Sequence, residues 1–267
     1  MDKEIIDIFA ASLALGTVSG LMAGLFGIGG GLVIVPVLAL VFSAYHFPAE
    51  QVLLMAVATS LATIILTAIA SVVAHHRLGT MLWDKVLRLS PLIGFGAAVG
   101  AVIAKQISAD TLRAILVVFL LYFGTIMALQ VKPKPGTTKQ PKWLDYTVAT
   151  LIGLLSSMVG MGGGALTVPY LVHGQMPVLN AVAVASACGL PVAIVGTASY
   201  ALLGWDAVQL PQWSLGFVYL PAFIGIALSS VCTAPIGARL AHKLPAAKLK
   251  RYFSLLLFVM AARLLWH

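Results

Sequence analysis

The chain has 267 residues, of which 61% are hydrophobic and 9% charged, and its formal net charge is +8. A soluble domain of this size could not cover so much apolar surface, which excludes a soluble enzyme and a secreted disulfide scaffold. A nucleic-acid binder is also excluded, because the basic residues of a multispan membrane protein collect in cytoplasmic loops and account for the charge.

Two long stretches of the chain carry no Asp, Glu, Lys or Arg. They lie between Asp7 and Glu50 and between Asp145 and Asp206. A membrane-spanning helix needs roughly 20 apolar residues, so each stretch holds more than one crossing. Strand-type alternation is absent, and we therefore expect an all-α polytopic membrane protein. The acidic N-terminus is unlike a signal peptide, so we expect the first apolar stretch to remain as a membrane segment.

The apolar segments predict about 8–10 membrane segments. In chain order they fall near 5–26, 31–45, 50–74, 87–104, 112–130, 144–160, 163–175, 179–203, 213–238 and 252–265. The polar stretch at 131–143 has three prolines and four lysines, a composition typical of an exposed connector. We therefore expect a first membrane repeat at 1–130, a linker at 131–143 and a second membrane repeat at 144–267.

The two halves resemble each other. Residues 27–36 read GIGGGLVIVP and residues 160–169 read GMGGGALTVP, with six of ten positions identical. Gly20-Leu21 matches Gly153-Leu154 in the same register, and 56–59 resembles 183–186. Several such matches in the same order indicate an internal duplication.

Basic residues show how the halves are oriented. If every segment returns the chain across or back, twelve Lys and Arg lie on one side and four on the other. The positive-inside rule places the richer side in the cytoplasm. Because each half has five segments, the second half enters from the opposite face, and equivalent loops exchange charge. We expect inverted repeats in a plasma membrane (the bacterial inner membrane), with the linker cytoplasmic and both termini outside.

The glycine clusters at 27–31 and 160–164 predict two breaks in membrane helices, each forming a hairpin. A new helix begins after each break, and its first turn carries free N–H groups with partial positive charge. Two such N-termini from inverted halves would form an anion site without a cationic side chain. The glycines expected to bind substrate are Gly27, Gly29, Gly30, Gly31, Gly160, Gly162, Gly163 and Gly164.

Neutral polar side chains in the apolar runs are the second expected ingredient. Thr59 and Ser60 lie in the first half, and Ser186 takes the place of Thr59 in the repeat. Hydroxyl groups donate to oxyanions and are cheaper to bury than charges. The alternative is that they bond to carbonyls of their own helices. For the GxxxG-spaced glycines the favoured interpretation is helix packing, and Gly96→Ala is expected to retain most transport; this set is Gly16, Gly20, Gly24, Gly96 and Gly100.

The duplicated G-x-G-G-G-x-x-x-V-P motif resembles that of the sulfite exporter TauE/SafE family. The resemblance extends over nearly the whole chain and implies a multispan transporter of small sulfur-containing anions such as sulfite, sulfoacetate or other organosulfonates. Some members of the family are thought to import. No intramembrane carboxylate is in place to couple a driving cation, and an anion leaving an inside-negative cell gains about 2.3 kcal/mol per 100 mV. We therefore expect export.

Two other classes of function remain as alternatives. One is an importer of a related small organic anion, and the other is a membrane assembly partner that transports nothing. An intramembrane enzyme is disfavoured, because no paired carboxylates, metal-ligand spacing or serine elbow are present. We expect no metal and no cofactor. The expected partners are the small anion and the lipid bilayer, without nucleic acid, and a homodimer is left open.

Overall fold

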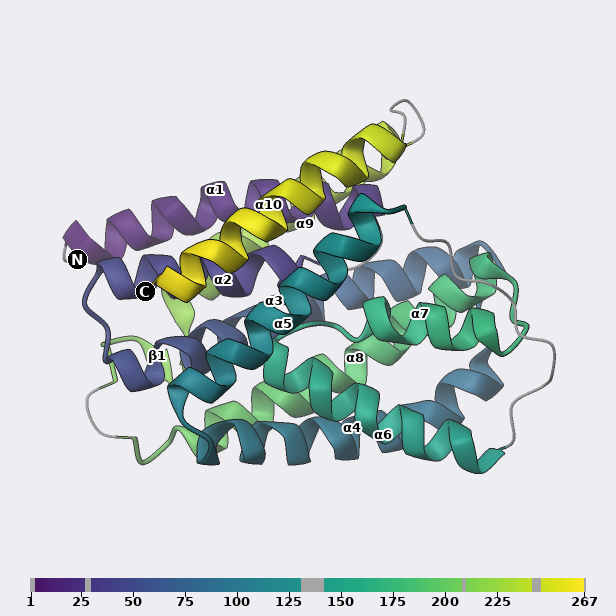
Figure 1. Cartoon of the computed structure of the whole chain (residues 1–267), viewed down its shortest axis with the longest axis horizontal. Coiled ribbons are helices and arrows are strands. Elements are labelled where there is room, and N and C mark those ends of the chain that lie inside the picture. Colours follow the sequence, from purple (N-terminus) through teal and green to yellow (C-terminus); the bar gives the residue numbers. More distant parts are fainter. Residues whose placement is uncertain (1–2, 27–29, 131–141, 208–209, 242–245, 267) are drawn as a thin grey trace.

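A computed structural model describes residues 3–26, 30–130, 142–207, 210–241 and 246–266. Within these ranges the chain forms ten helices and one short two-stranded hairpin (Figure 1). The helices of the first half follow the predicted segments closely. They are α1 (Lys3–Phe26), α2 (Gly31–Ala44), α3 (Ala49–Arg77), α4 (Trp83–Gln106) and α5 (Ala109–Ala128).

The second half repeats this order, with one difference near its fourth segment. Its helices are α6 (Lys142–Val159), α7 (Gly164–His173), α8 (Val178–Leu203), α9 (Leu220–Ala241) and α10 (Ala246–Trp266). The segment predicted at 213–238 is too long at its start, because β1 (Ser214–Leu215) and β2 (Val218–Tyr219) pair antiparallel there. Gly216, at φ +54°, allows the tight turn between the two strands, so the chain forms a hairpin before α9 begins.

Many large apolar side chains lie on the surface of the bundle. Leu87 and Phe95 on α4 and Val118 on α5 are each more than 60% exposed. By length and composition, α1, α3, α4, α5 and α8 could each cross a membrane. Such a surface is stable only in lipid, and the chain is a multi-pass helical membrane protein.

The helices place the connections at two opposite ends of the bundle. We call the end where α1 begins and α10 finishes the terminal end, and the end where α5 finishes and α6 begins the linker end (Figure 1). At the linker end, Asn180 Nδ2 donates to the Thr80 carbonyl at 2.9 Å. At the terminal end, Lys105 Nζ donates to the Leu203 carbonyl at 2.7 Å. The first half therefore starts at the terminal end and the second half at the linker end, as inverted repeats require.

Helix pairing keeps its pattern when each helix is exchanged for its counterpart five helices away. Helix α1 packs along α9, and α6 packs along α4. Helices α3 and α8 pair with each other, as do α5 and α10. Each half thus supplies its first helix to the fourth helix of the other half, so neither half buries its apolar surface alone.

Small residues bring the helices close together where α1 crosses α9 and where α4 crosses α6. A Cβ built at Gly16 or Gly20 would collide with α9, and one built at Gly96 or Gly100 would collide with α6. The packing interpretation is supported at these positions, and the surroundings of Gly24 lie outside the described residues. The crossing at Gly96 is tighter than the expectation for Gly96→Ala assumed, because the added carbon would overlap the backbone carbonyl of Thr150.

We predict that Gly96→Ala destabilises the protein by about 1–3 kcal/mol, the usual effect of overpacking a close contact. Gly94→Ala on the same helix is the control, because its Cβ would lie 3.4 Å from Val195 Cγ2, an ordinary contact. Thermal unfolding of the purified proteins in detergent compares the two variants. Equal melting temperatures for both would contradict the tight α4–α6 crossing.

Candidate functional site

The second glycine cluster forms a sharp break inside the bundle. Helix α6 ends at Val159 and α7 begins at Gly164. Between them Gly160 and Gly163 both have φ +72°, a conformation that favours glycine. In the first half α2 begins at Gly31, whereas Gly27 and Gly29 lie outside the described residues. Each break turns the chain back toward the end where its hairpin began.

The two breaks contact each other. A Cβ built at Gly31 would lie 2.5 Å from the Gly160 carbonyl oxygen, so only glycine fits at the start of α2. The same carbonyl accepts a hydrogen bond from Ser60 Oγ at 2.9 Å. On the other side, a Cβ at Gly189 of α8 would lie 2.6 Å from the Gly162 carbonyl oxygen. The second break is therefore held between α2 and α3 of the first half and α8 of the second.

A helix begins after each break, α2 at Gly31 and α7 at Gly164. In α2 the N–H groups of Val33 and Ile34 donate to the Gly30 carbonyl at 3.0 and 3.1 Å. In α7 the N–H groups of Leu166 and Thr167 donate to the Gly163 carbonyl at 3.1 and 2.9 Å. The residues before them in each first turn direct their N–H groups along the helix axis without a partner in the helix. Partial positive charge from both helices is thus concentrated at the breaks.

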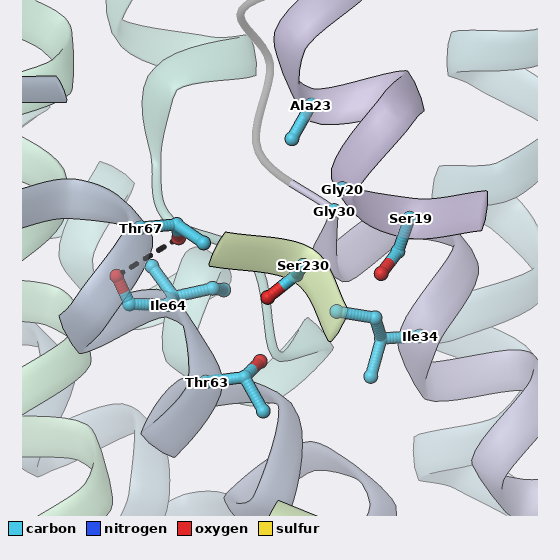
Figure 2. Close-up of a pocket in the computed structure, with 9 residues that line it drawn as sticks. All are labelled: Ser19, Gly20, Ala23, Gly30, Ile34, Thr63, Ile64, Thr67 and Ser230. Carbon is cyan, nitrogen blue, oxygen red and sulfur yellow. Dashed lines mark hydrogen bonds between the residues drawn. The ribbon is translucent and has the colours of Figure 1, made fainter. Parts of the chain in front are cut away.

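A small cavity lies beside the first break. Figure 2 shows the hydroxyl groups of Ser19 (α1), Thr63 (α3) and Ser230 (α9) around the space next to Gly30. Its volume is about 10 Å³, room for roughly one water molecule. The nine described residues that line it include no charged group. The cavity is uncharged, lined by hydroxyl and apolar groups, and too small for an oxyanion.

The hydroxyl groups around the cavity donate to carbonyls of their own helices. Ser19 Oγ bonds to the Gly16 carbonyl at 3.3 Å, and Thr63 Oγ1 bonds to the Ser60 carbonyl at 2.7 Å. A hydroxyl can rotate from such a carbonyl toward a ligand, because the carbonyl keeps its helical partner. These hydroxyls can therefore donate to another acceptor without leaving a carbonyl unpaired.

Ser156 was missed by sequence reasoning. Its side chain is fully buried in the last turn of α6, and its Oγ has no hydrogen-bond partner among the described residues. The Oγ lies 3.4 Å from the position that a Cβ would take at Gly163. A buried hydroxyl without a partner is costly, and this one lies beside the start of α7. The signal in the sequence was the Ser156-Ser157 pair just before the second glycine cluster.

The structure separates the predicted site residues into groups. Gly30 borders the cavity, Gly31, Gly160 and Gly162 form the contact between the breaks, and Gly163 and Gly164 begin α7.

The three predicted hydroxyl side chains have different partners. Ser60 bonds to Gly160, whereas Thr59 Oγ1 accepts from the Tyr219 N–H at 3.0 Å and so faces β2. Ser186 Oγ donates to the Val182 carbonyl of its own helix, as the alternative interpretation held.

The terminal end is closed by aromatic rings. Phe42 and Phe47 stack with centroids 4.9 Å apart, and the Tyr219 ring meets both edge-on.

At the linker end, His75 Nδ1 lies 3.2 Å from Thr80 Oγ1, and Trp83 Nε1 donates to His76 Nδ1. The histidines therefore brace the α3–α4 turn and lie away from the breaks. Within the described ranges, no three His, Cys, Asp or Glu residues are grouped to hold a metal ion.

Comparisons with known proteins agree on one family and one kind of activity. The profile of the family described as "Sulfite exporter TauE/SafE" matches residues 12–264. A "Probable membrane transporter protein" of Haemophilus influenzae is 36% identical over 250 residues, covering 93% of this chain and 95% of the relative. A probable membrane transporter protein of Methanocaldococcus jannaschii is 24% identical, covering 97% and 96%. Another from Bacillus subtilis, YdhB, is 24% identical, covering 86% and 89%. No solved structure matches the chain significantly.

We predict that Ser60→Ala destabilises the protein by about 1–3 kcal/mol, because the buried Gly160 carbonyl loses its donor. Ser186→Ala is the matched control, since its hydroxyl bonds within its own helix and alanine is the strongest helix former. Thermal unfolding in detergent measures both. A Ser186→Ala loss as large as that of Ser60→Ala would mean that the contact between the breaks contributes little.

Proposed function

The chain belongs to the sulfite exporter TauE/SafE family of membrane transporters, and from this membership and the site geometry we propose that it exports a small sulfur-containing oxyanion. Sulfite, sulfoacetate and other organosulfonates are the substrate class. The observation that carries the proposal is that the two glycine breaks, each followed by the start of a helix, contact each other at Gly31 and Gly160. Buried neutral hydroxyls lie beside them, and one of these, Ser156 next to Gly163, has no partner among the described residues. The donors of the site are backbone N–H and side-chain O–H groups.

The charge distribution favours an anion over a cation. A site for a hard cation would need buried carboxylates at the breaks. Of the described acidic residues, only Asp145 is buried, and it lies in the first turn of α6, away from the glycine contact. Helix N-termini and hydroxyls stabilise a negative charge without an ion pair that would hold it too tightly for release.

The cavity holds about one water molecule, so transport requires movement. A space for one water molecule must enlarge to admit an oxyanion, and the aromatic cluster of Phe42, Phe47 and Tyr219 blocks the terminal end. We propose alternating access, in which the hairpins α1–α2 and α6–α7 shift against α3 and α8. The breaks supply the binding groups, and the inverted halves expose them to one face at a time.

The proposed direction is export, with the linker end in the cytoplasm. An anion moving outward from an inside-negative cell gains about 2.3 kcal/mol per charge per 100 mV. No carboxylate of the described residues lies at the breaks to bind a coupling cation. Downhill efflux of an anion needs none.

We predict that Ser156→Ala raises the KM for sulfite or sulfonate efflux from proteoliposomes about tenfold, the effect of losing one hydrogen bond to a charged group. Its melting temperature stays the same or rises, because a buried hydroxyl without a partner is removed. Gly163→Leu abolishes flux, since Gly163 lies at φ +72°.

The control is Ser254→Ala, another buried serine, which donates to the Arg251 carbonyl in α10. It leaves the KM unchanged. Wild-type protein that is folded but carries no small sulfur-containing anion would sink the proposed function. An unchanged KM in Ser156→Ala would remove Ser156 from the site.

Sidedness is tested with single cysteines in a variant lacking Cys188 and Cys232. Leu78 at the linker end and Trp205 at the terminal end are 70% and 69% exposed. A membrane-impermeant maleimide should label Trp205→Cys in intact cells and Leu78→Cys only after permeabilisation. The reverse labelling pattern would mean that the linker end faces outward and the terminal end faces the cytoplasm.

A further inference from the structure

A group of charged side chains joins three helices at the linker end, outside the glycine contact. Lys85 and Arg88 lie in the first two turns of α4, and Asp145 lies in the first turn of α6. Lys85 Nζ donates to Asp145 Oδ2 at 2.7 Å, and the hydroxyl of Tyr170 in α7 donates to Oδ1 at 2.7 Å. The Asp145 side chain is 2% exposed, so the carboxylate is buried with both oxygens occupied.

Arg88 is left with unused donors. Its Nη2 lies 3.5 Å from Asp145 Oδ2, within ion-pair range, but Nε and Nη2 are buried and no described residue accepts a hydrogen bond from them. The guanidinium lies over the Tyr146 ring, 5.3 Å from its centroid, which fixes its plane. With two cations and one carboxylate, the group carries one excess positive charge. Unsatisfied buried guanidinium N–H groups are costly unless an anion accepts from them.

The fold does not need these charges at this crossing. In the other half α9 crosses α1, and a Cβ built at Gly225 would lie 2.9 Å from Ser12 Cβ. When Gly20 is aligned with Gly153, Ser12 corresponds to Asp145. When Gly100 is aligned with Gly237, which also matches Leu112-Arg113 with Leu249-Lys250, Arg88 corresponds to Gly225. The same helix crossing is therefore made once by small residues and once by a buried ion pair. A requirement of packing would apply to both halves, so the charged version serves something that only the linker end does.

We propose that Arg88 and Lys85 form a second oxyanion-binding site, at the linker-end mouth of the α6–α7 hairpin. An oxyanion such as a sulfonate accepts from the Arg88 fork, for which guanidinium geometry is suited, and competes with Asp145 for Lys85. That the ligand is the transported anion rests on the proposed function. The phosphate of an anionic lipid offers the same chemistry, because the side chains of Lys85 and Arg88 are 33% and 27% exposed.

Tyr170 connects this site to the glycine breaks. It lies on α7, whose first residue is Gly164, and its hydroxyl is bonded to Asp145. An anion that draws Lys85 away from Asp145 loosens the hold of α4 on the α6–α7 hairpin. Binding at the mouth thereby favours movement of the helix whose N-terminus belongs to the central site.

Equilibrium binding of radiolabelled methanesulfonate to purified protein in uncharged detergent tests the proposal without requiring flux. Arg88→Gln is expected to weaken binding at the mouth about tenfold, and Arg88→Lys, which keeps the charge and loses the fork, by less. Asp145→Asn is expected to strengthen binding several-fold, because a competing carboxylate is removed. Arg113→Gln is the control, since the ion-pair partner of Arg113 among the described residues is the exposed Asp110 in the same helix.

If the charged group only holds the helices together and binds no anion, a different result is expected. Methanesulfonate affinity would then be unchanged in Arg88→Gln, or weakened equally in Arg88→Gln and Asp145→Asn, and either result overturns the site. Combining Arg88→Gln with Ser156→Ala separates the mouth from the central site, because independent losses add. Displacement of methanesulfonate by phosphatidylglycerol, dependent on Arg88, would assign the same donors to a lipid phosphate.

Arg88-dependent binding by a protein that shows no flux would uphold the mouth site and reject the transport proposal. If the wild-type protein shows flux and Arg88→Gln changes neither flux nor binding, the transport proposal is upheld and the mouth site is rejected.

Discussion

A helix broken inside a bilayer leaves backbone groups that lipid cannot satisfy, and this constraint organises the centre of the protein. The carbonyl of Gly160 is satisfied by a serine of the other half, and the space beside it is filled by the first residue of α2. Neither break is tolerable alone, because each borders the other or a helix from the opposite half. The pairing of α1 with α9 and of α6 with α4 likewise joins a helix of one half to a helix of the other.

This arrangement leaves backbone donors at the centre and charges at the edge. The central hydroxyls of Ser19, Thr63 and Ser230 are neutral, whereas the buried carboxylate of Asp145 lies at the linker end with two cations. An anion at the centre would meet dipoles rather than full charges, which hold it without the desolvation cost of a buried ion pair. The proposed transport of an oxyanion uses that difference, since a transported ligand must also leave.

The two ends of the bundle are closed by different chemistry. Stacked and edge-on rings of Phe42, Phe47 and Tyr219 close the terminal end, and ionic hydrogen bonds to Asp145 join the helices of the linker end. Aromatic packing opens without leaving unpaired charge, whereas opening the ionic contacts separates a buried carboxylate from its cations, which is costly. A duplicated architecture has thus become unequal at the two faces where the proposed transport would load and release.

The sequence by itself determined the membrane class, the hairpins, the duplication and the family, because apolar runs, glycine clusters and repeated motifs are local. It also located Ser60 and the glycines at the contact between the breaks. Tertiary structure alone decided which hydroxyls face which groups, since those partners are far apart in the chain. Ser60 bonds to Gly160 across 100 residues, Thr59 turns to Tyr219 across 160, and Lys85 reaches Asp145 across 60. The unpartnered hydroxyl of Ser156 and the tight crossing at Gly96 became visible only once the helices were placed against each other, because burial belongs to the packed bundle and not to any one segment.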